Sequence, residues 1–170
     1  PPDVWKDKPF YNQVSHLTRE ANKLHKLPVQ NGNKTLDVVI YPGHQGKILN
    51  NIPVVYTPDG YCFSHNGDQN YGNMKEDTVW INDIKNHHKI DVLMYNSYMS
   101  SNWINGFDPE LVLTAHENEL GHGIHSRFPY WKVHNRLESI SYPYIVMAWG
   151  EKYNYLRKND QQNKKKLKDD

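Results

Sequence analysis

The strongest constraint in the sequence is the stretch Asp108-Pro109-Glu110, which precedes an apolar run that ends among histidines. Aspartate is a favourable helix N-cap, proline suits the first helical position, and glutamate in the first turn complements the helix dipole. The stretch therefore predicts a helix over residues 109–125, interrupted only by two glycines. The chain must place such a helix so that its apolar side is buried.

Three histidines of this predicted helix, His116, His122 and His125, are candidate metal ligands. A zinc hydrolase needs imidazole nitrogens that converge on one ion, an open position for water, and a carboxylate that accepts the water's proton. The usual helical arrangement, H-E-x-x-H, sets two ligands one turn apart. Here His122 follows His116 by six residues, and on a regular helix two such side chains diverge by roughly 120°. His116 therefore joins the site only from its edge or on a distorted helix.

A second register begins at Asn118 and keeps the E-x-x-H spacing, with Glu119 three residues before His122. On a regular helix this register places Asn118, His122 and His125 on one face. The candidate general bases are Glu119 and Glu117. We expect Glu119 to be the base because it stands beside His122, whereas Glu117 points toward the apolar side of the helix.

The stretch 113–124 resembles the active-site helix of the metzincins, especially the matrixin-like bacterial peptidases, whose consensus is H-E-L-G-H-x-x-G-x-x-H. Relative to that consensus, Asn118-Glu119 has the form of a two-residue insertion. The segment 144–150 is similar to the Met-turn of the family, in which a methionine, here Met147, lies beneath the metal. The resemblance implies a zinc-dependent endopeptidase that uses one catalytic Zn²⁺ and acts on a peptide or protein substrate.

The third ligand implied by this resemblance is left open by the sequence. The family's third histidine would fall at position 128, which is Phe128. His125 replaces it if the loop after the helix is shortened, and His116 is the alternative from the first register. Two later residues, His134 and Glu138, are further candidates, and Glu138 is the kind of carboxylate that gluzincins use.

The whole chain predicts an α+β fold of the zincin-like type. Such a fold has a twisted mixed sheet with a backing helix and an active-site helix, then a small irregular C-terminal lobe with a last helix. We expect residues 1–170 to form a single catalytic domain, with lobes over 1–125 and 126–170. Hydrophobic periodicity and charge predict helices over 10–27 and 150–168. Apolar runs predict strands over 35–41, 52–57, 60–64, 78–82 and 90–95, with a hairpin turn at Pro58-Asp59-Gly60.

Composition limits the partners. A net charge of +1 argues against nucleic acid as a partner, and no apolar run approaches the ~20 residues of a membrane span. Cys62 is the only cysteine, so neither an intramolecular disulfide nor a cysteine-based zinc site can form. The chain begins at Pro1 without an initiator methionine. This start is typical of an excised domain or of a processed mature form, and it favours a protein made with a leader or pro-segment. We also expect a secreted protein of bacterial type that acts as a monomer.

Two rival functions remain. One is a catalytically degenerate zincin-like domain that binds a partner, and the other is a metal hydrolase that is not a peptidase. The histidines outside the predicted helix, including His44, His65 and His87-His88, are interpreted as ordinary loop residues. The loop 66–73 offers oxygen atoms to Ca²⁺, but it lacks the carboxylate density of an EF-hand. Calcium is therefore possible but unsupported, and a flexible loop is the preferred interpretation.

Overall fold

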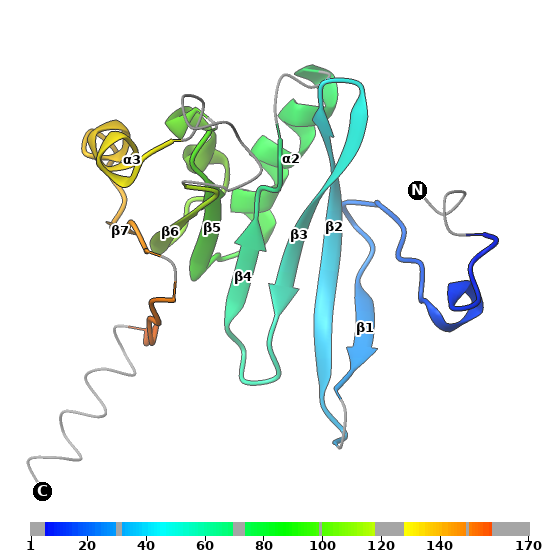
Figure 1. The fold of residues 1–170 in the computed structure, drawn as a ribbon. Helices are drawn as coiled ribbons and strands as arrows, with labels where there is room; N and C mark the ends of the chain where they lie inside the picture. Colours follow the sequence, from blue (N-terminus) through cyan, green and yellow to red (C-terminus); the bar gives the residue numbers. More distant parts are fainter. Residues whose placement is uncertain are drawn as a thin grey trace, which may run out of the picture.

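A computed structural model describes residues 6–29, 32–69, 74–98, 100–117, 128–148 and 150–157. Among these residues, one seven-stranded mixed sheet and two α-helices form an α+β fold, and the strands lie in the sheet in sequence order (Figure 1). The strands are β1 (His25–Pro28), β2 (Thr35–Gln45), β3 (Ile48–Tyr56), β4 (Cys62–His65), β5 (Val92–Asn96), β6 (Leu111–Ala115) and β7 (Tyr144–Ile145). The helices are α2 (Met74–His87) and α3 (Tyr130–Leu137), with 3-10 turns η1 (Tyr11–Gln13) and η2 (Ser101–Gly106).

The sheet changes direction at β4. From β1 to β4 neighbouring strands are antiparallel, and from β4 to β7 they are parallel. Parallel neighbours need a long crossover connection, which α2 supplies between β4 and β5. The carboxyl ends of β4, β5 and β6 therefore meet at one edge of the sheet. In open sheets with parallel strands, that edge is where ligands bind.

The core lies between the sheet and α2, which covers one face of the sheet in Figure 1. Alternate strand residues point into it, and each fully buried apolar side chain contributes about 1.5–3 kcal/mol. Its members include Tyr41, Ile52, Val54, Cys62, Ile84, Leu93, Tyr95, Ile104, Phe107, Val112, Val133 and Leu137. The last two belong to α3, so the second helix is tied to the same core.

A hydrogen-bonded histidine fastens the end of α2 to the sheet. The Tyr41 hydroxyl donates to Asp83 Oδ2 at 2.7 Å, so it accepts from Nε2–H of His88 at 2.8 Å. Nδ1 of His88 in turn accepts from the Tyr56 hydroxyl at 2.5 Å. Burial lowers the pKa of His88, and the nearby Asp83 carboxylate opposes this only in part. His88 is therefore held in its neutral form by the folded chain.

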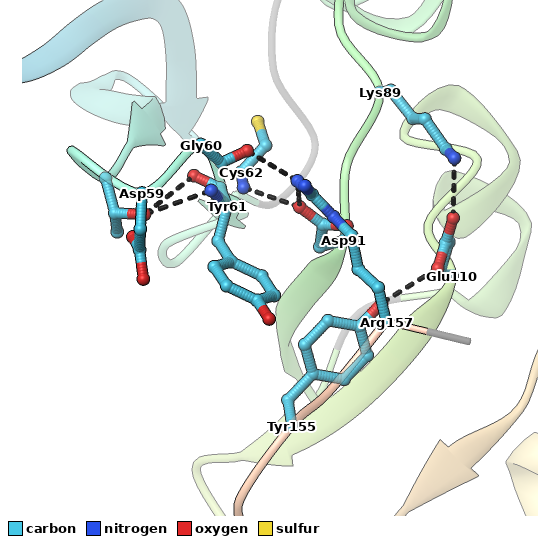
Figure 2. Close-up of polar contacts among 10 residues, drawn as sticks. Asp59, Gly60, Tyr61, Cys62, Lys89, Asp91, Glu110, Tyr155 and Arg157 are labelled. Atoms are coloured by element: carbon cyan, nitrogen blue, oxygen red, sulfur yellow. Dashed lines mark hydrogen bonds and ion pairs between the residues drawn. The ribbon is translucent and has the colours of Figure 1, made fainter. Parts of the chain in front are cut away.

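The C-terminal segment is tied to the sheet by an ion pair with a buried carboxylate (Figure 2). Asp91 is fully buried at the start of β5 and accepts from the backbone N–H of Cys62 at 2.7 Å. Arg157 donates from Nε to Asp91 Oδ1 at 2.6 Å and from Nη2 to Oδ2 at 2.5 Å. The guanidinium also lies over the ring of Tyr61, 4.6 Å from its centroid. One arginine thus neutralises Asp91 and anchors the segment 150–157.

A second contact of this segment is more exposed. The Tyr155 hydroxyl donates to Glu110 Oε2 at 2.8 Å, and Lys89 Nζ lies 2.8 Å from Glu110 Oε1 (Figure 2). The Lys89 side chain is 79% exposed and that of Glu110 is 29% exposed. Such a solvated pair contributes about 0–1 kcal/mol, so Arg157 is the main polar anchor.

The helix predicted over 10–27 is wrong. Only the 3-10 turn η1 forms there, and β1 takes up the end of the segment. Three of its apolar residues, Phe10, Val14 and Leu24, are 43%, 47% and 48% exposed, while Ala21 packs against the core. A helix with so little buried surface is only marginally stable, and the end of the segment instead pairs with β2.

The strand predicted over 78–82 is also wrong, because these residues lie within α2. Threonine, valine, tryptophan and isoleucine favour strands in isolation. The helical spacing that decides the outcome is that of Ile81 and Ile84, both of which contact the core. A crossover helix is what the parallel pairing of β4 with β5 requires.

The helix predicted over 109–125 is wrong for its first part. Residues Leu111–Ala115 form β6, which pairs in parallel with β5 and β7. A run of apolar and β-branched residues fits a strand with neighbours on both sides, so tertiary pairing overrides the helix-start signal. His116 follows with a φ of +76°, outside the right-handed helical region. Residues 118–127 lie outside the described part of the chain.

The strands predicted over 35–41, 52–57, 60–64 and 90–95 are confirmed as β2, β3, β4 and β5, with shifted ends, and β3 and β4 form the expected hairpin. The helix predicted over 150–168 is wrong for 150–157, which has no helix, and its remainder is not among the described residues. No helix in the described ranges is long and apolar enough to cross a membrane.

Candidate functional site

Four polar residues gather where the parallel strands end. His65 is the last residue of β4, Asp68 lies three residues further on, Asn96 ends β5, and His116 follows β6. Parallel pairing brings these ends to the same edge, because His65 is in register with Met94 and Asn96 with Ala115. The site is thus built by the topology of the sheet.

Asn96 is the centre of this group. Its backbone N–H donates to Asn66 Oδ1 at 2.8 Å. Its side-chain Nδ2 donates to the Gly67 carbonyl at 3.1 Å and to Asp68 Oδ1 at 3.0 Å. Its Oδ1 lies 3.2 Å from His116 Nδ1. With 4% of its surface exposed, Asn96 links the loop after β4 to the residue after β6.

His116 is half-buried at the exit of β6, and its ring packs edge-on against Tyr98, with centroids 5.1 Å apart. Asn96 and Tyr98 therefore fix the imidazole from two sides. A left-handed φ is uncommon outside glycine, although histidine is among the residues that tolerate it. The turn at His116 aims the imidazole at the edge where β4 and β5 also end.

His65 lies in the same electrostatic environment. Its Nδ1 accepts from the backbone N–H of Gly67 at 2.6 Å. Burial lowers the pKa of His65, while the Asp68 carboxylate raises it and His116 lowers it further. His65 thus interacts electrostatically with both Asp68 and His116, and burial favours its neutral form.

The end of β2 adjoins the same loop. The backbone N–H of His44 donates to Gln69 Oε1 at 2.6 Å, and Gln69 is fully buried. The neighbouring Gly43 leaves room for this contact, since a Cβ there would lie 2.4 Å from Gln69 Oε1. His44 is therefore held next to the loop that carries Asp68.

Glu117 is the described carboxyl group nearest His116 in the chain, and it is 4% exposed. Burial raises its pKa, and the Thr114 hydroxyl and His116 oppose that rise. A buried carboxyl with a raised pKa can carry a proton at higher pH than an exposed one. Of the two predicted general bases, Glu117 is described and directly follows His116 in the chain, while Glu119 lies outside the described residues.

The other predicted site residues are only partly placed. His122 and His125 lie outside the described residues. Met147 follows β7 on an irregular segment and is half-buried. His134 on α3 packs its ring against Tyr144, and Glu138 at the end of that helix is exposed. Within the described ranges, no three His, Cys, Asp or Glu side chains are arranged to hold a metal ion.

Sequence reasoning missed Asn96, and it interpreted His65 and the loop that carries Asp68 as ordinary loop residues. The signal was present, since each stands at or just after the end of an apolar run. These positions can be assigned to one edge of the sheet only when β4, β5 and β6 are known to be parallel. The wrong prediction of a strand over 78–82 replaced the crossover helix that this parallel order requires. Comparison with protein-family models, curated proteins and solved structures gave no match, so the functional argument rests on this geometry.

Proposed function

We propose that the protein is a zinc-dependent hydrolase whose metal is bound at this edge by His116 and Asp68. The observation that carries the proposal is the hydrogen bonding of both side chains to Asn96, at 3.2 Å and 3.0 Å. Imidazole nitrogen and carboxylate oxygen are both zinc ligands in proteins. Ligands of this kind are usually held by a further hydrogen-bonding shell, which is the part that Asn96 would play.

The donor set fits zinc as far as the structure describes it. One proposed ligand, Asp68, lies in the loop after β4, and another, His116, directly follows β6. A third is expected from His122 or His125, the histidines that the sequence predicts as ligands. His65 is a neighbour and not a ligand through Nδ1, because that nitrogen accepts from Gly67. A site with three protein ligands keeps a position for water, as catalytic zinc sites do.

The chemistry would be hydrolysis by an activated water. Zinc, when bound, would lower the pKa of a water and polarise the carbonyl or similar group to be attacked. The chain supplies the proton acceptor, either Glu119 or Glu117, and returns the proton to the leaving group. His116 and Asp68 are ordered by contacts to Asn96 before any ligand arrives, which limits the reorganisation needed on binding.

A peptide bond remains the substrate proposed, on the strength of the metzincin resemblance. The zincin-like arrangement needs an active-site helix, and such a helix would begin after Glu117, because 111–115 is a strand. The register that starts at Asn118 agrees with a helix that begins after Glu117. A metal hydrolase of another bond class is the second candidate, and the observation that favours it is that His116 follows a strand instead of lying on a helix.

Metal content tests the proposal first. We expect about one zinc per chain, with sharply weakened binding in His116→Ala and Asp68→Asn. The matched control is His87→Ala, an exposed histidine on α2 whose removal should leave zinc unchanged. Equal zinc content in all four proteins, or none in any, would contradict the site.

Substrate class is tested second, by cleavage of an unstructured protein and of simple ester and phosphodiester substrates. Protein cleavage that depends on His116 supports the endopeptidase. Turnover of the simple substrates alone supports the second candidate. Zinc binding without turnover of any substrate would indicate the degenerate binding domain.

A further inference from the structure

The side chain of Asn96 has its full hydrogen-bonding capacity in use. A side-chain amide offers two N–H donors and a carbonyl oxygen with two lone pairs. Both donors are engaged, one by the Gly67 carbonyl and one by Asp68 Oδ1. Both lone pairs are engaged as well, by the backbone N–H of Tyr98 at 3.0 Å and by His116 Nδ1. Rotating the amide by half a turn would break all of these bonds, so its orientation is fixed.

This accounting determines where His116 carries its proton. The group that faces His116 Nδ1 is the amide oxygen of Asn96, which can only accept. Nδ1 must therefore be the protonated nitrogen of the neutral ring, and the lone pair of the ring is on Nε2. Neutral histidine in water prefers the opposite tautomer, with the proton on Nε2. The fold thus selects the less common form.

We infer that Asn96 is a positioning residue that presents Nε2 of His116, together with the carboxylate of Asp68, as one preorganised pair of metal ligands. This inference rests on the proposed metal site and adds how the site is controlled. Because the same amide bonds to both ligands, a change at Asn96 reaches both at once. An amide does not ionise, so the side chain of Asn96 keeps the same donors and the same acceptor as the pH changes.

The tautomer can be measured without any metal. Long-range ¹H–¹⁵N correlation spectra of the metal-free protein distinguish protonated from unprotonated ring nitrogens, and His116→Gln assigns the signals. We expect His116 to carry its proton on Nδ1 in the native chain. In Asn96→Asp the carboxylate still accepts from Nδ1, so that tautomer should persist. In Asn96→Ala the acceptor is gone, and the Nε2–H form should dominate. A native His116 with its proton on Nε2 would overturn the inference.

Metal affinity separates positioning from general support of the fold. The probe is Co²⁺, whose visible absorption reports the number and geometry of its ligands. Asn96→Ala should bind Co²⁺ about 10- to 100-fold more weakly than the native chain, the usual effect of losing such a supporting contact. The control is Ser97→Ala, since Ser97 is fully buried and its hydroxyl donates to the Ala115 carbonyl at 3.0 Å.

Both variants should lose thermal stability, while only Asn96→Ala should lose affinity for Co²⁺. Equal Co²⁺ affinities in native protein, Asn96→Ala and Ser97→Ala would refute the positioning role. If no variant and not even the native chain binds Co²⁺, the proposed function fails, while the tautomer measurement still decides whether Asn96 controls His116. If Asn96→Ala does not fold, the native and Asn96→Asp spectra decide the question.

Discussion

Removing Arg157 should destabilise the protein far more than its place near the end of the described chain suggests. Breaking a buried ion pair by deleting one partner typically costs about 3–5 kcal/mol, because the other charge stays buried and unpaired. Asp91 is 0% exposed, whereas the Arg157 side chain is 33% exposed. We therefore place Arg157→Met at the lower end, about 3 kcal/mol. For a chain of this size, that corresponds to a fall in melting temperature of roughly 6–12 °C.

Chemical and thermal unfolding, followed by circular dichroism, measure this loss. Lys89→Met is the matched control, because it also deletes a cation from a carboxylate, but from an exposed pair with Glu110. It should cost about 0–1 kcal/mol. Adding Asp91→Asn to Arg157→Met should recover part of the lost stability, since it removes the uncompensated charge. The reasoning is refuted if Arg157→Met behaves like Lys89→Met, or if the double variant is less stable than Arg157→Met alone.

Three further outcomes are expected. Folding lowers the pKa of His88 below its ordinary 6.5, so His88 stabilises the fold above that pH, and this stabilisation is lost as the pH falls through the folded-state pKa. Urea titrations across this pH range should show a smaller loss of stability in His88→Gln than in the native protein. Gly67 has a φ of +55°, and an added Cβ would lie 2.6 Å from the Asn50 side chain, so Gly67→Ala should lower the free energy of unfolding by about 1–3 kcal/mol in the same assay. The control is Gly46→Ala, which has a φ of +58° but open space around it and should therefore show only the cost of backbone strain. If the register from Asn118 is right, Glu119→Gln should keep zinc and lose about 10²–10⁴ in turnover, with Glu117→Gln milder, and the reverse order in steady-state assays would make Glu117 the base.

The strands of the first half of the chain could be predicted from sequence because their signals are local. β2, β3 and β4 have apolar or β-branched runs, and Pro58-Asp59-Gly60 marks the turn between the last two. Helix α2 could not be predicted in the same way, because the segment 78–82 has strand-forming residues inside a helix. What decides it is the crossover between parallel strands, a property of the whole sheet.

The residues of the candidate site also differ in whether local sequence signals could identify them. His116 and Glu117 could be found because histidine beside glutamate is a recognisable local pattern. Asp68 and Asn96 could not, because their roles depend on contacts across 28 and 20 residues of chain, from Asn96 to Asp68 and to His116. Composition and hydrophobic periodicity do not predict contacts between residues so far apart in the chain.

The backbone at His116 bears on the two registers that spacing alone left open. In the register that starts at His116, this histidine and Glu117 would occupy the first turn of a continuous active-site helix. A φ of +76° at His116 and the strand before it are incompatible with that arrangement. The other register does not require a helix at His116, so it is consistent with the strand that precedes this residue. Under the proposed function, His116 would then be a ligand supplied by the end of β6, and its partner Asp68 would come from the loop after β4.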